Sequence, residues 1–286
     1  MSFRTGDCDA RMSPRERRVI CRKGAEIPVS HDQGPRTWDE FRRTRADRRK
    51  PLVIAHRGTP TQRPENTLAS FANALDQGAD VLETDLRFSQ DGIIVLVHDE
   101  TLDRTTDGSG LVASHSVAEI RRLRTKSPTG DYTDERIPTL LDLLSMTQAQ
   151  VPLLLELKDP LFAEEAYARQ LAQTLAAYGM LDKSAVVSFN MEFVRSVERV
   201  CPDLPFGLIT LTRPWPSPGT PLLGPLWLYL FANPLYVAWA HKMDAIVAPL
   251  DTVPEKRMWY YRWLGVDAVL TDSPAAAVAA INGESV

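Results

Sequence analysis

The chain has 286 residues, enough for one large barrel domain or two small ones, and its 44% hydrophobic and 24% charged residues are ordinary for a soluble globular protein. The formal net charge of −4 is unevenly spread, since residues 1–50 carry +6 and the rest of the chain carries −10. An acidic body suits a cation site and argues against broad binding to nucleic acid. We therefore expect a basic, flexible extension at residues 1–50, in which a short basic helix is an alternative from Trp38 onward, and a folded body at residues 51–286.

Cysteine usage and hydropathy indicate a cytoplasmic protein. The three cysteines are odd in number and form no CxxC pair, and the first 30 residues contain no apolar segment typical of a secretory signal. The most apolar stretch, at residues 222–240, is interrupted by two prolines, a glycine and an asparagine. We expect no membrane-spanning helix, so that any membrane contact would be peripheral.

Short apolar runs bounded by turn residues indicate buried strands that alternate with amphipathic helices. The predicted strands lie at residues 52–55, 80–82, 93–97, 152–158, 185–189, 206–211, 245–248 and 268–271. The predicted helices lie at residues 66–77, 139–146, 163–178, 191–200, 235–243, 254–264 and 274–281. This alternation predicts an α/β fold of the (β/α)8 TIM-barrel type. An open doubly wound sheet is the alternative, but no Gly-rich phosphate loop follows the first strand.

Two longer segments interrupt the alternation. Residues 100–138 are rich in Thr, Asp and Gly, with a short helix predicted at residues 117–123, and we expect this insertion to follow the third strand and to cover the active-site mouth. Residues 213–234 form a Pro-rich apolar excursion after the sixth strand.

Carboxylates gather at the predicted strand ends. Glu83 and Asp85 are two positions apart on the second strand, so their side chains share a face, and Glu156 and Lys158 do the same on the fourth. Three carboxylates without a thiolate suit a hard divalent cation, Mg²⁺ or Ca²⁺. The competing interpretation is a salt-bridged cluster that Lys158 neutralises, and these residues alone do not decide between the two.

Two histidines at strand ends favour a catalytic site. His56 and His98 flank the carboxylate pair in sequence and suit general acid and base work near neutral pH, with metal ligation as the alternative role. Arg57 offers a planar fork that matches a phosphate. Together with the cation site and Lys158 these groups are typical of phosphoryl transfer. Asp272 could line the mouth of the barrel or cap the last helix, and capping is favoured.

These motifs resemble the glycerophosphodiester phosphodiesterase family over roughly residues 52–282. The resemblance rests on His56-Arg57-Gly58, Pro64-Glu65-Asn66-Thr67, Glu83-Thr84-Asp85, His98-Asp99, Leu102-Asp103-Arg104-Thr105-Thr106, Glu156-Leu157-Lys158, Gly265-Val266-Asp267 and Thr271-Asp272.

The resemblance implies a TIM barrel with a small insertion and a metal-dependent hydrolase of glycerophosphodiesters, which releases glycerol phosphate and an alcohol, in some members through a cyclic phosphate. It implies that one divalent cation is held by Glu83, Asp85 and Glu156. It further implies that His56 and His98 are the acid and the base, and that the phosphate is bound by Arg57 and Lys158.

One departure from the family pattern leaves alternative functions open. Members often carry Trp-Thr-Val-Asn after the seventh strand, where this chain has Leu250-Asp251-Thr252-Val253, so the usual aromatic wall is missing or comes from elsewhere. With the apolar stretch at residues 222–240, this makes hydrolysis of a lysophospholipid at a membrane surface an alternative, in which that stretch forms an apolar lip. A catalytically silent phospholipid-binding barrel is a more remote one.

Overall fold

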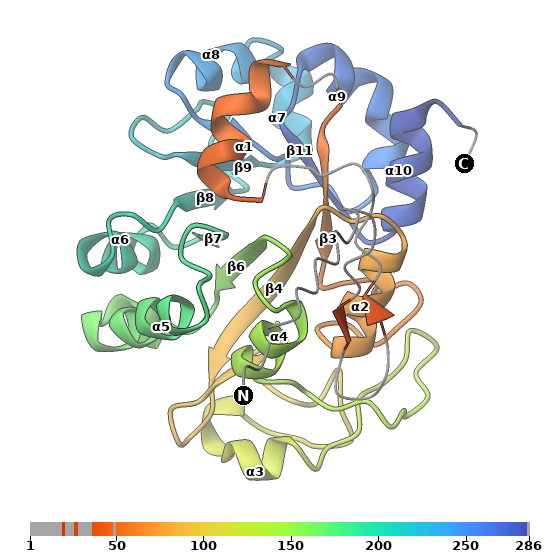
Figure 1. Ribbon diagram of the computed structural model, residues 1–286, viewed down its shortest axis with the longest axis vertical. Helices are drawn as coiled ribbons and strands as arrows, with labels where there is room; N and C mark the ends of the chain where they lie inside the picture. Colours follow the sequence, from red (N-terminus) through yellow and green to blue (C-terminus); the bar gives the residue numbers. More distant parts are fainter. Residues whose placement is uncertain (1–18, 21–25, 28–35, 48–49, 285–286) are drawn as a thin grey trace, which may run out of the picture.

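The computed structural model describes residues 19–20, 26–27, 36–47 and 50–284 (Figure 1). The flexibility predicted for residues 1–50 falls mainly on residues outside this range. Val19–Ile20 (β1) and Glu26–Ile27 (β2) pair as a small antiparallel ladder. None of the helices in the described part of the chain has the length and apolar character that crossing a bilayer requires.

Within residues 50–284, eight parallel strands form a nearly closed barrel, as the sequence predicted. They are Leu52–His56 (β3), Val81–Phe88 (β4), Leu153–Leu157 (β6), Ser184–Ser188 (β7), Phe206–Thr210 (β8), Leu222–Pro225 (β9), Ile246–Val247 (β10) and Ala268–Thr271 (β11). Neighbouring strands pair in the order β10, β9, β8, β7, β6, β4, β3, β11. The seam between β10 and β11 is bridged by a 3.0 Å hydrogen bond from the Asp267 amide to the Val247 carbonyl.

One predicted barrel strand does not belong to the barrel. The run at residues 93–97 forms Ile94–Leu96 (β5), which pairs antiparallel with the end of β4. This is possible because β4 continues to Phe88, beyond its last pairing with β6 at Leu86. The chain then turns and returns along β4. The prediction that residues 93–97 form the third barrel strand is therefore wrong, and the insertion follows the hairpin of β4 and β5.

The missing barrel strand is β9, which lies inside the segment that the sequence analysis treated as an excursion. Its four residues include a glycine and a proline, which hide it from a pattern search for apolar strands. A side chain at Gly207 of β8 would bring its Cβ within 2.7 Å of the Leu222 carbonyl oxygen, so the close approach of β8 and β9 requires glycine there.

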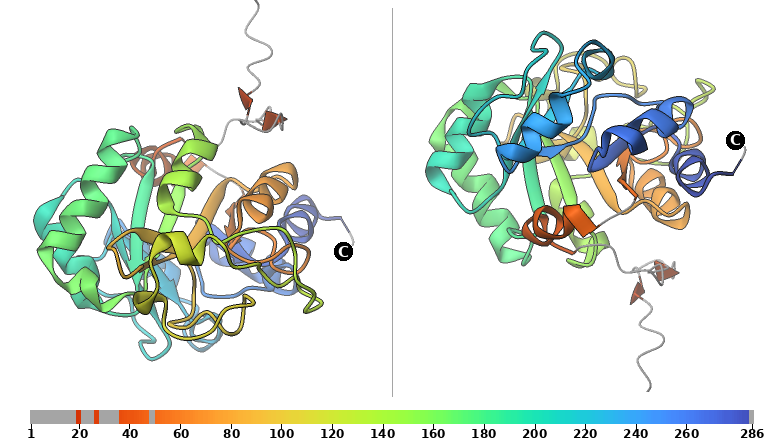
Figure 2. Two further views of the ribbon diagram at one scale, coloured as in Figure 1. Left: turned by 90° about the horizontal axis from the view of Figure 1, so that it is seen from below. Right: turned by 90° about the horizontal axis from the view of Figure 1, so that it is seen from above.

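Helices alternate with the strands and surround the barrel (Figures 1 and 2). Eight of the nine α-helices of residues 50–284 agree with the prediction within a few residues, whereas α7 was not predicted. The α-helices of residues 50–284 are Leu68–Asp76 (α2), Val117–Ile120 (α3), Leu140–Thr147 (α4), Glu165–Ala177 (α5), Met191–Val200 (α6), Trp227–Ala232 (α7), Tyr236–Lys242 (α8), Met258–Leu264 (α9) and Pro274–Asn282 (α10). Short 3-10 turns lie at Val112–Ser114 (η2), Pro160–Ala163 (η3) and Pro254–Arg257 (η4).

A helix within the N-terminal extension packs against the barrel. Trp38–Thr44 (α1) begins at Thr37, whose side chain accepts a hydrogen bond from the Glu40 amide, and continues into Arg45–Asp47 (η1). Trp38 and Phe41 are buried in the same apolar cluster as the inward residues of the barrel strands. The indole Nε1–H of Trp38 donates to the Leu153 carbonyl at 3.1 Å, where β6 begins. Helix α1 therefore closes the amino-terminal end of the barrel, opposite the strand ends that carry the polar residues.

Candidate active site

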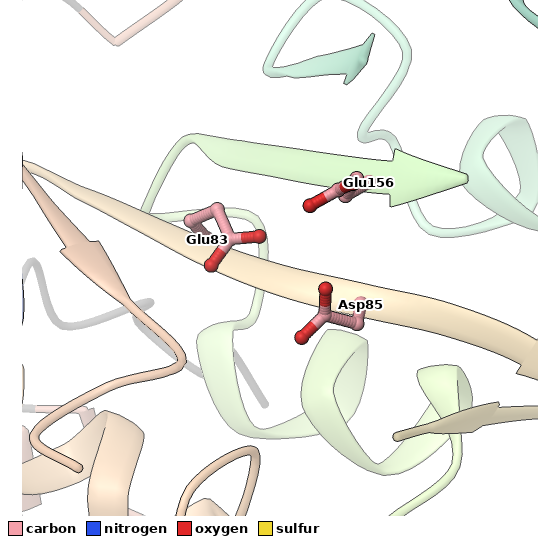
Figure 3. A group of neighbouring side chains, drawn as sticks. All are labelled: Glu83, Asp85 and Glu156. Atoms are coloured by element: carbon pink, nitrogen blue, oxygen red, sulfur yellow. The ribbon is translucent and has the colours of Figure 1, made fainter. Parts of the chain in front are cut away.

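The strand register brings three predicted carboxylates together. Asp85 on β4 pairs with Glu156 on β6, and Glu83 lies two residues earlier on β4, so all three side chains face the same side. One oxygen from each lies within 4.8 Å of the other two. Figure 3 shows the three carboxylates pointing toward a common point. A divalent cation could be held here by oxygen ligands alone, in agreement with the prediction of a metal site.

Burial makes this cluster electrostatically costly. Burial, followed by the charges of Asp85 and Glu156, raises the pKa of Glu83 well above its usual value. Burial together with the charge of Asp85 raises the pKa of Glu156 to about 7. Burial acts in the same direction on Asp85, but Arg57 and Lys158 outweigh it and lower the pKa of that carboxyl. The buried oxygens Asp85 Oδ1 and Glu156 Oε1 have no aligned hydrogen-bond donor. The donor set therefore fits a bound cation, which would compensate this charge.

Two cationic side chains border the carboxylates. The Nζ of Lys158 lies 2.6 Å from Glu156 Oε1 and 3.5 Å from Asp85 Oδ1. The Nε of Arg57 lies 3.0 Å from Asp85 Oδ2, and its Nη1 donates to Glu65 at 3.2 Å. The salt-bridged cluster of the alternative interpretation is therefore partly present. It is incomplete, because the pKa values of Glu83 and Glu156 stay raised beside these cations.

The Arg57-Gly58 turn has a backbone that few sequences allow. Arg57 has φ 54° and Gly58 has φ 86°, both in the left-handed region. A Cβ at Gly58 would lie 2.4 Å from the Ser70 hydroxyl, which accepts a hydrogen bond from the Thr59 amide and donates to the Arg57 carbonyl. The Arg57 amide donates to a Glu83 carboxylate oxygen at 3.0 Å. The turn thus fixes Arg57 against the carboxylates through its backbone as well as its side chain.

Asn66 ties the same region to β4. Its side-chain amide donates to Asp85 Oδ2 at 2.9 Å, and its carbonyl accepts from the Thr84 hydroxyl at 2.7 Å. It is buried, and its φ of 56° is left-handed, a conformation that asparagine tolerates better than most residues. Asn66 was recognised in the sequence only as part of a motif, and its contact with Asp85 assigns it a positioning role.

His56 ends β3, beside Glu83 on the neighbouring strand. Its Nδ1 lies 2.6 Å from the Asp272 carboxylate, which follows β11. Because an ionised carboxylate only accepts, Nδ1 carries the proton and Nε2 is left for chemistry. The prediction that Asp272 caps the last helix is wrong, since the N-cap of α10 is Ser273 and the Asp272 carboxylate is directed at His56.

His98 reaches the site by the return of β5 along β4. The Val97 amide donates to the Asp85 carbonyl at 3.1 Å, so the next residue arrives at the level of the carboxylates. The Nδ1 of His98 lies 2.7 Å from Asp99, and burial lowers the pKa of the imidazole. Both histidines thus carry a carboxylate partner on Nδ1.

Arg104 connects the His98 side of the site to the Arg57 side. Its guanidinium contacts both carboxylate oxygens of Asp99 and both of Glu65, and Glu65 in turn accepts from Arg57. The hydrogen bond from Arg104 is the main reason that the pKa of Asp99 falls to about 2. Arg104 therefore belongs to a hydrogen-bonded loop that holds Asp99, the partner of His98, and Glu65, the partner of Arg57.

Three of the predicted site residues, His56, Glu83 and Glu156, form the polar wall of a pocket inside the barrel. The volume of the pocket is about 440 Å³ including the space open to solvent. The rest of its lining is apolar and comes from six barrel strands and from two residues that follow β10: Ile54, Leu154, Val187, Ile209, Leu222, Gly224, Ala248, Leu250 and Leu270.

Comparisons with known proteins identify the family of the chain. Residues 56–276 match the model of the glycerophosphoryl diester phosphodiesterase family. The chain belongs to this family. It is 31% identical over 237 residues to a glycerophosphodiester phosphodiesterase of Caldanaerobacter subterraneus subsp. tengcongensis, which covers 80% of this chain and 97% of that protein. The chain is thus a phosphoric diester hydrolase.

Solved structures of the family share the fold. An Oleispira antarctica phosphodiesterase in complex with the product sn-glycerol-3-phosphate has a TM-score of 0.70 and 30% identity, covering 82% of this chain and 97% of that one. A glycerophosphodiester phosphodiesterase of Galdieria sulphuraria, described as putative, has a TM-score of 0.71 at 24% identity, covering 81% and 98% of the two chains, which supports the fold alone.

The family departure after the seventh predicted strand has a structural explanation. Leu250 lines the pocket where an aromatic residue was expected, and the buried Asp251 accepts a hydrogen bond from the Tyr261 hydroxyl. An aromatic ring is supplied from another strand, because the exposed Phe189 follows β7 and its ring centroid lies 5.4 Å from the Lys158 ammonium. Sequence reasoning missed Phe189, since it read the residue as the last of an ordinary buried strand.

Proposed function

We propose that this family member hydrolyses glycerophosphodiesters to glycerol phosphate and an alcohol in a reaction that requires a divalent cation. The observation that carries the proposal is the excess of buried negative charge at Glu83, Asp85 and Glu156, which Arg57 and Lys158 leave incompletely compensated. The glycerophosphodiester phosphodiesterase function of the relatives and the related structure in complex with sn-glycerol-3-phosphate support the same substrate class.

Glu83, Asp85 and Glu156 are the residues that would hold the cation, and their oxygens favour Mg²⁺ or Ca²⁺ over zinc. When bound, such a cation supplies positive charge beside the phosphate oxygens of the substrate. Arg57 and Lys158 bind the remaining phosphate oxygens, because both cations already lie at the border of the carboxylates and would turn part of their charge toward a bound anion.

His98 is the general base and His56 the general acid in this proposal. Burial lowers the pKa of His98, so its imidazole is neutral and able to accept a proton at neutral pH. The Asp272 carboxylate orients the His56 imidazole through its contact with Nδ1 at 2.6 Å and leaves Nε2 for proton transfer. His98 takes the proton of the attacking hydroxyl, and His56 gives a proton to the departing alcohol oxygen.

The attacking hydroxyl is the neighbouring hydroxyl of the substrate glycerol. Its oxygen bonds to phosphorus as the bond to the leaving alcohol breaks, which gives a cyclic glycerol phosphate. Water then opens the ring, and the two histidines exchange roles. His56 takes a proton from the water and His98 gives its proton to the ring oxygen that leaves phosphorus, so both histidines return to their starting protonation states when glycerol phosphate is formed.

Soluble glycerophosphodiesters are favoured over lysophospholipids. The stretch at residues 222–240, from which an apolar lip was predicted, contributes a strand and core residues to the fold, since Leu222 and Leu223 lie in β9, and Leu230 and Tyr236 are buried. A soluble substrate also suits the cytoplasmic location that the cysteine usage predicts, which fractionation of the cells that make the protein would test.

The reaction is tested by choline release from glycerophosphocholine after EDTA treatment and after the return of Mg²⁺ or Ca²⁺. Release should disappear with EDTA and reappear with one of the two ions. A second substrate that lacks the middle glycerol hydroxyl separates the two routes, since the cyclic route predicts little choline release from it.

Phosphorus NMR during turnover should detect the cyclic glycerol phosphate directly. A His115→Ala variant is the matched control for His98→Ala, because His115 bonds only its own loop at Leu111. Choline release that persists in EDTA would reject the metal requirement. Equal rates on both substrates would reject the cyclic route but leave the hydrolase itself standing.

A further inference from the structure

Five of the eight exposed aromatic side chains in the described residues lie on the helices α7, α8 and α9 and the loop beside them. All six tryptophans lie in the described residues, and four of them are exposed. Trp259 is 70% exposed, Trp263 69% and Trp215 57%. With Trp239 and Phe231 they make up what we call the aromatic surface. Rings of this size in water carry a hydrophobic cost that an ordinary solvated face does not have.

Ring stacking fixes the shape of the aromatic surface. Trp215 stacks on Trp239 with ring centroids 5.6 Å apart. Phe231 and Trp263 both stack on the buried Tyr260, at 4.2 and 5.7 Å. Figure 1 shows the supporting helices α7, α8 and α9 next to one another at the top of the molecule, and Figure 2 shows them from above. The rings are therefore held by packed helices and are already ordered for binding.

Basic residues outnumber acidic ones in the segment that carries these rings, although the body of the protein is acidic. Residues 211–263 contain five Lys and Arg against three Asp and Glu, whereas residues 51–286 as a whole carry −10. Of the three acids, Asp251 is buried and Asp244 pairs with Arg42 and Arg45. The exposed basic side chains of this segment are Arg213, Lys242, Lys256 and Arg262.

We propose that the aromatic surface docks the protein on an anionic membrane. Tryptophan rings are enriched at the boundary between lipid head groups and acyl chains, and basic side chains beside them gain attraction from anionic lipids. A second copy of the chain fits less well, because a symmetric dimer through this surface would bring its own positive charges face to face. The surface adjoins the mouth of the barrel, since α7 begins two residues after β9 ends. This surface differs from the predicted lip, because α9 and Trp215 lie outside residues 222–240.

Vesicle binding tests the proposal with the full chain. In co-sedimentation with vesicles of phosphatidylglycerol and phosphatidylcholine, we expect binding in low salt that falls at least tenfold with phosphatidylcholine alone or in high salt. The Trp259→Ser/Trp263→Ser variant should bind at least tenfold more weakly, and Lys242→Glu/Lys256→Glu should bind weakly and lose the preference for anionic lipid. Brominated lipids should quench tryptophan fluorescence in the wild type.

A control variant replaces two exposed apolar side chains elsewhere on the surface. Leu141→Ser/Tyr178→Ser removes side chains that are 44% and 39% exposed and should leave binding unchanged. Choline release from soluble glycerophosphocholine should stay at the wild-type rate in every variant, which separates this test from the test of catalysis. Wild-type binding no stronger than background, or full binding by the tryptophan variant, would overturn the proposal. If the wild type is a dimer and the Trp259→Ser/Trp263→Ser variant is a monomer, the aromatic surface is a dimer interface and not a membrane-binding surface.

Discussion

The Nδ1 of His56 and the Oδ1 of Asp272 lie 2.6 Å apart, although 216 positions separate the two residues in sequence. They meet because β3 and β11 pair in parallel, which brings the two strand ends together. The contact fixes both the orientation of the imidazole and its tautomer.

Replacement of Asp272 by Asn should therefore damage catalysis more than folding. An amide does not stabilise a protonated imidazole as a carboxylate does, so we expect kcat to fall by about 10²-fold or more. The high-pH limb of the pH-rate profile, which reports the general acid His56, should shift, while the melting temperature stays near that of the wild type. An unchanged pH-rate profile with a lower melting temperature would assign Asp272 a purely structural role.

The two histidines should have separable effects. His98→Ala and His56→Ala are each expected to cost about 10²-fold or more in kcat, the range for general acid–base groups. A substrate with a good leaving group, such as a nitrophenyl ester, needs little proton donation. It should thus rescue His56→Ala but not His98→Ala, and the reverse pattern would exchange their roles. Rates near that of wild type in either variant would remove that histidine from the mechanism.

The raised carboxyl pKa values predict an unusual pH dependence of stability in the metal-free protein. Glu156 has a folded pKa of about 7, above its unfolded value, so the folded state binds more protons between these two values. Its contribution to stability is therefore fully present at low pH and is lost as pH rises toward 7, at about 1.4 kcal/mol per unit of pKa difference. The lowered pKa of His98 acts in the opposite direction in part of this range.

Urea unfolding of wild type and Glu156→Gln in EDTA between pH 5 and pH 8 isolates the Glu156 contribution, because His98 is common to both proteins. The stability of the wild type relative to the variant should fall as pH rises. Saturating Mg²⁺ or Ca²⁺ should remove this trend in the wild type and raise its melting temperature. Parallel curves for the two proteins in EDTA would contradict the assignment of a strained carboxylate cluster.

Phe189 provides a test of substrate contact. Its ring is 45% exposed and lies beside the Lys158 ammonium, where a bound glycerol or head group would cover it. We expect Phe189→Ala to raise KM several-fold with a smaller effect on kcat, whereas Phe189→Leu should keep more of the affinity. The same KM for wild type and Phe189→Ala would exclude Phe189 from the binding wall.

The sequence predicted the barrel and the grouping of its polar residues because period-two spacing on a strand fixes which side chains share a face. Glu83 and Asp85 show this directly. The sequence pattern failed where a short apolar run is compatible with more than one place in the fold. Residues 94–96 look like a barrel strand but follow a turn that returns them along β4, and β9 is hidden by Gly224 and Pro225. Contacts between distant strand ends, such as that of Asp272 with His56, depend on the closure of the barrel, which no local pattern contains.

Helix α1 has a consequence for where the folding unit begins. The family match starts at residue 56, yet Trp38 and Phe41 fill the amino-terminal end of the barrel and are almost fully buried. A truncated chain that starts at Pro51 would keep every polar residue of the pocket but expose the apolar floor beneath them. Such a truncation is expected to aggregate or to lose activity on heating, so the shortest stable enzyme should begin before Thr37.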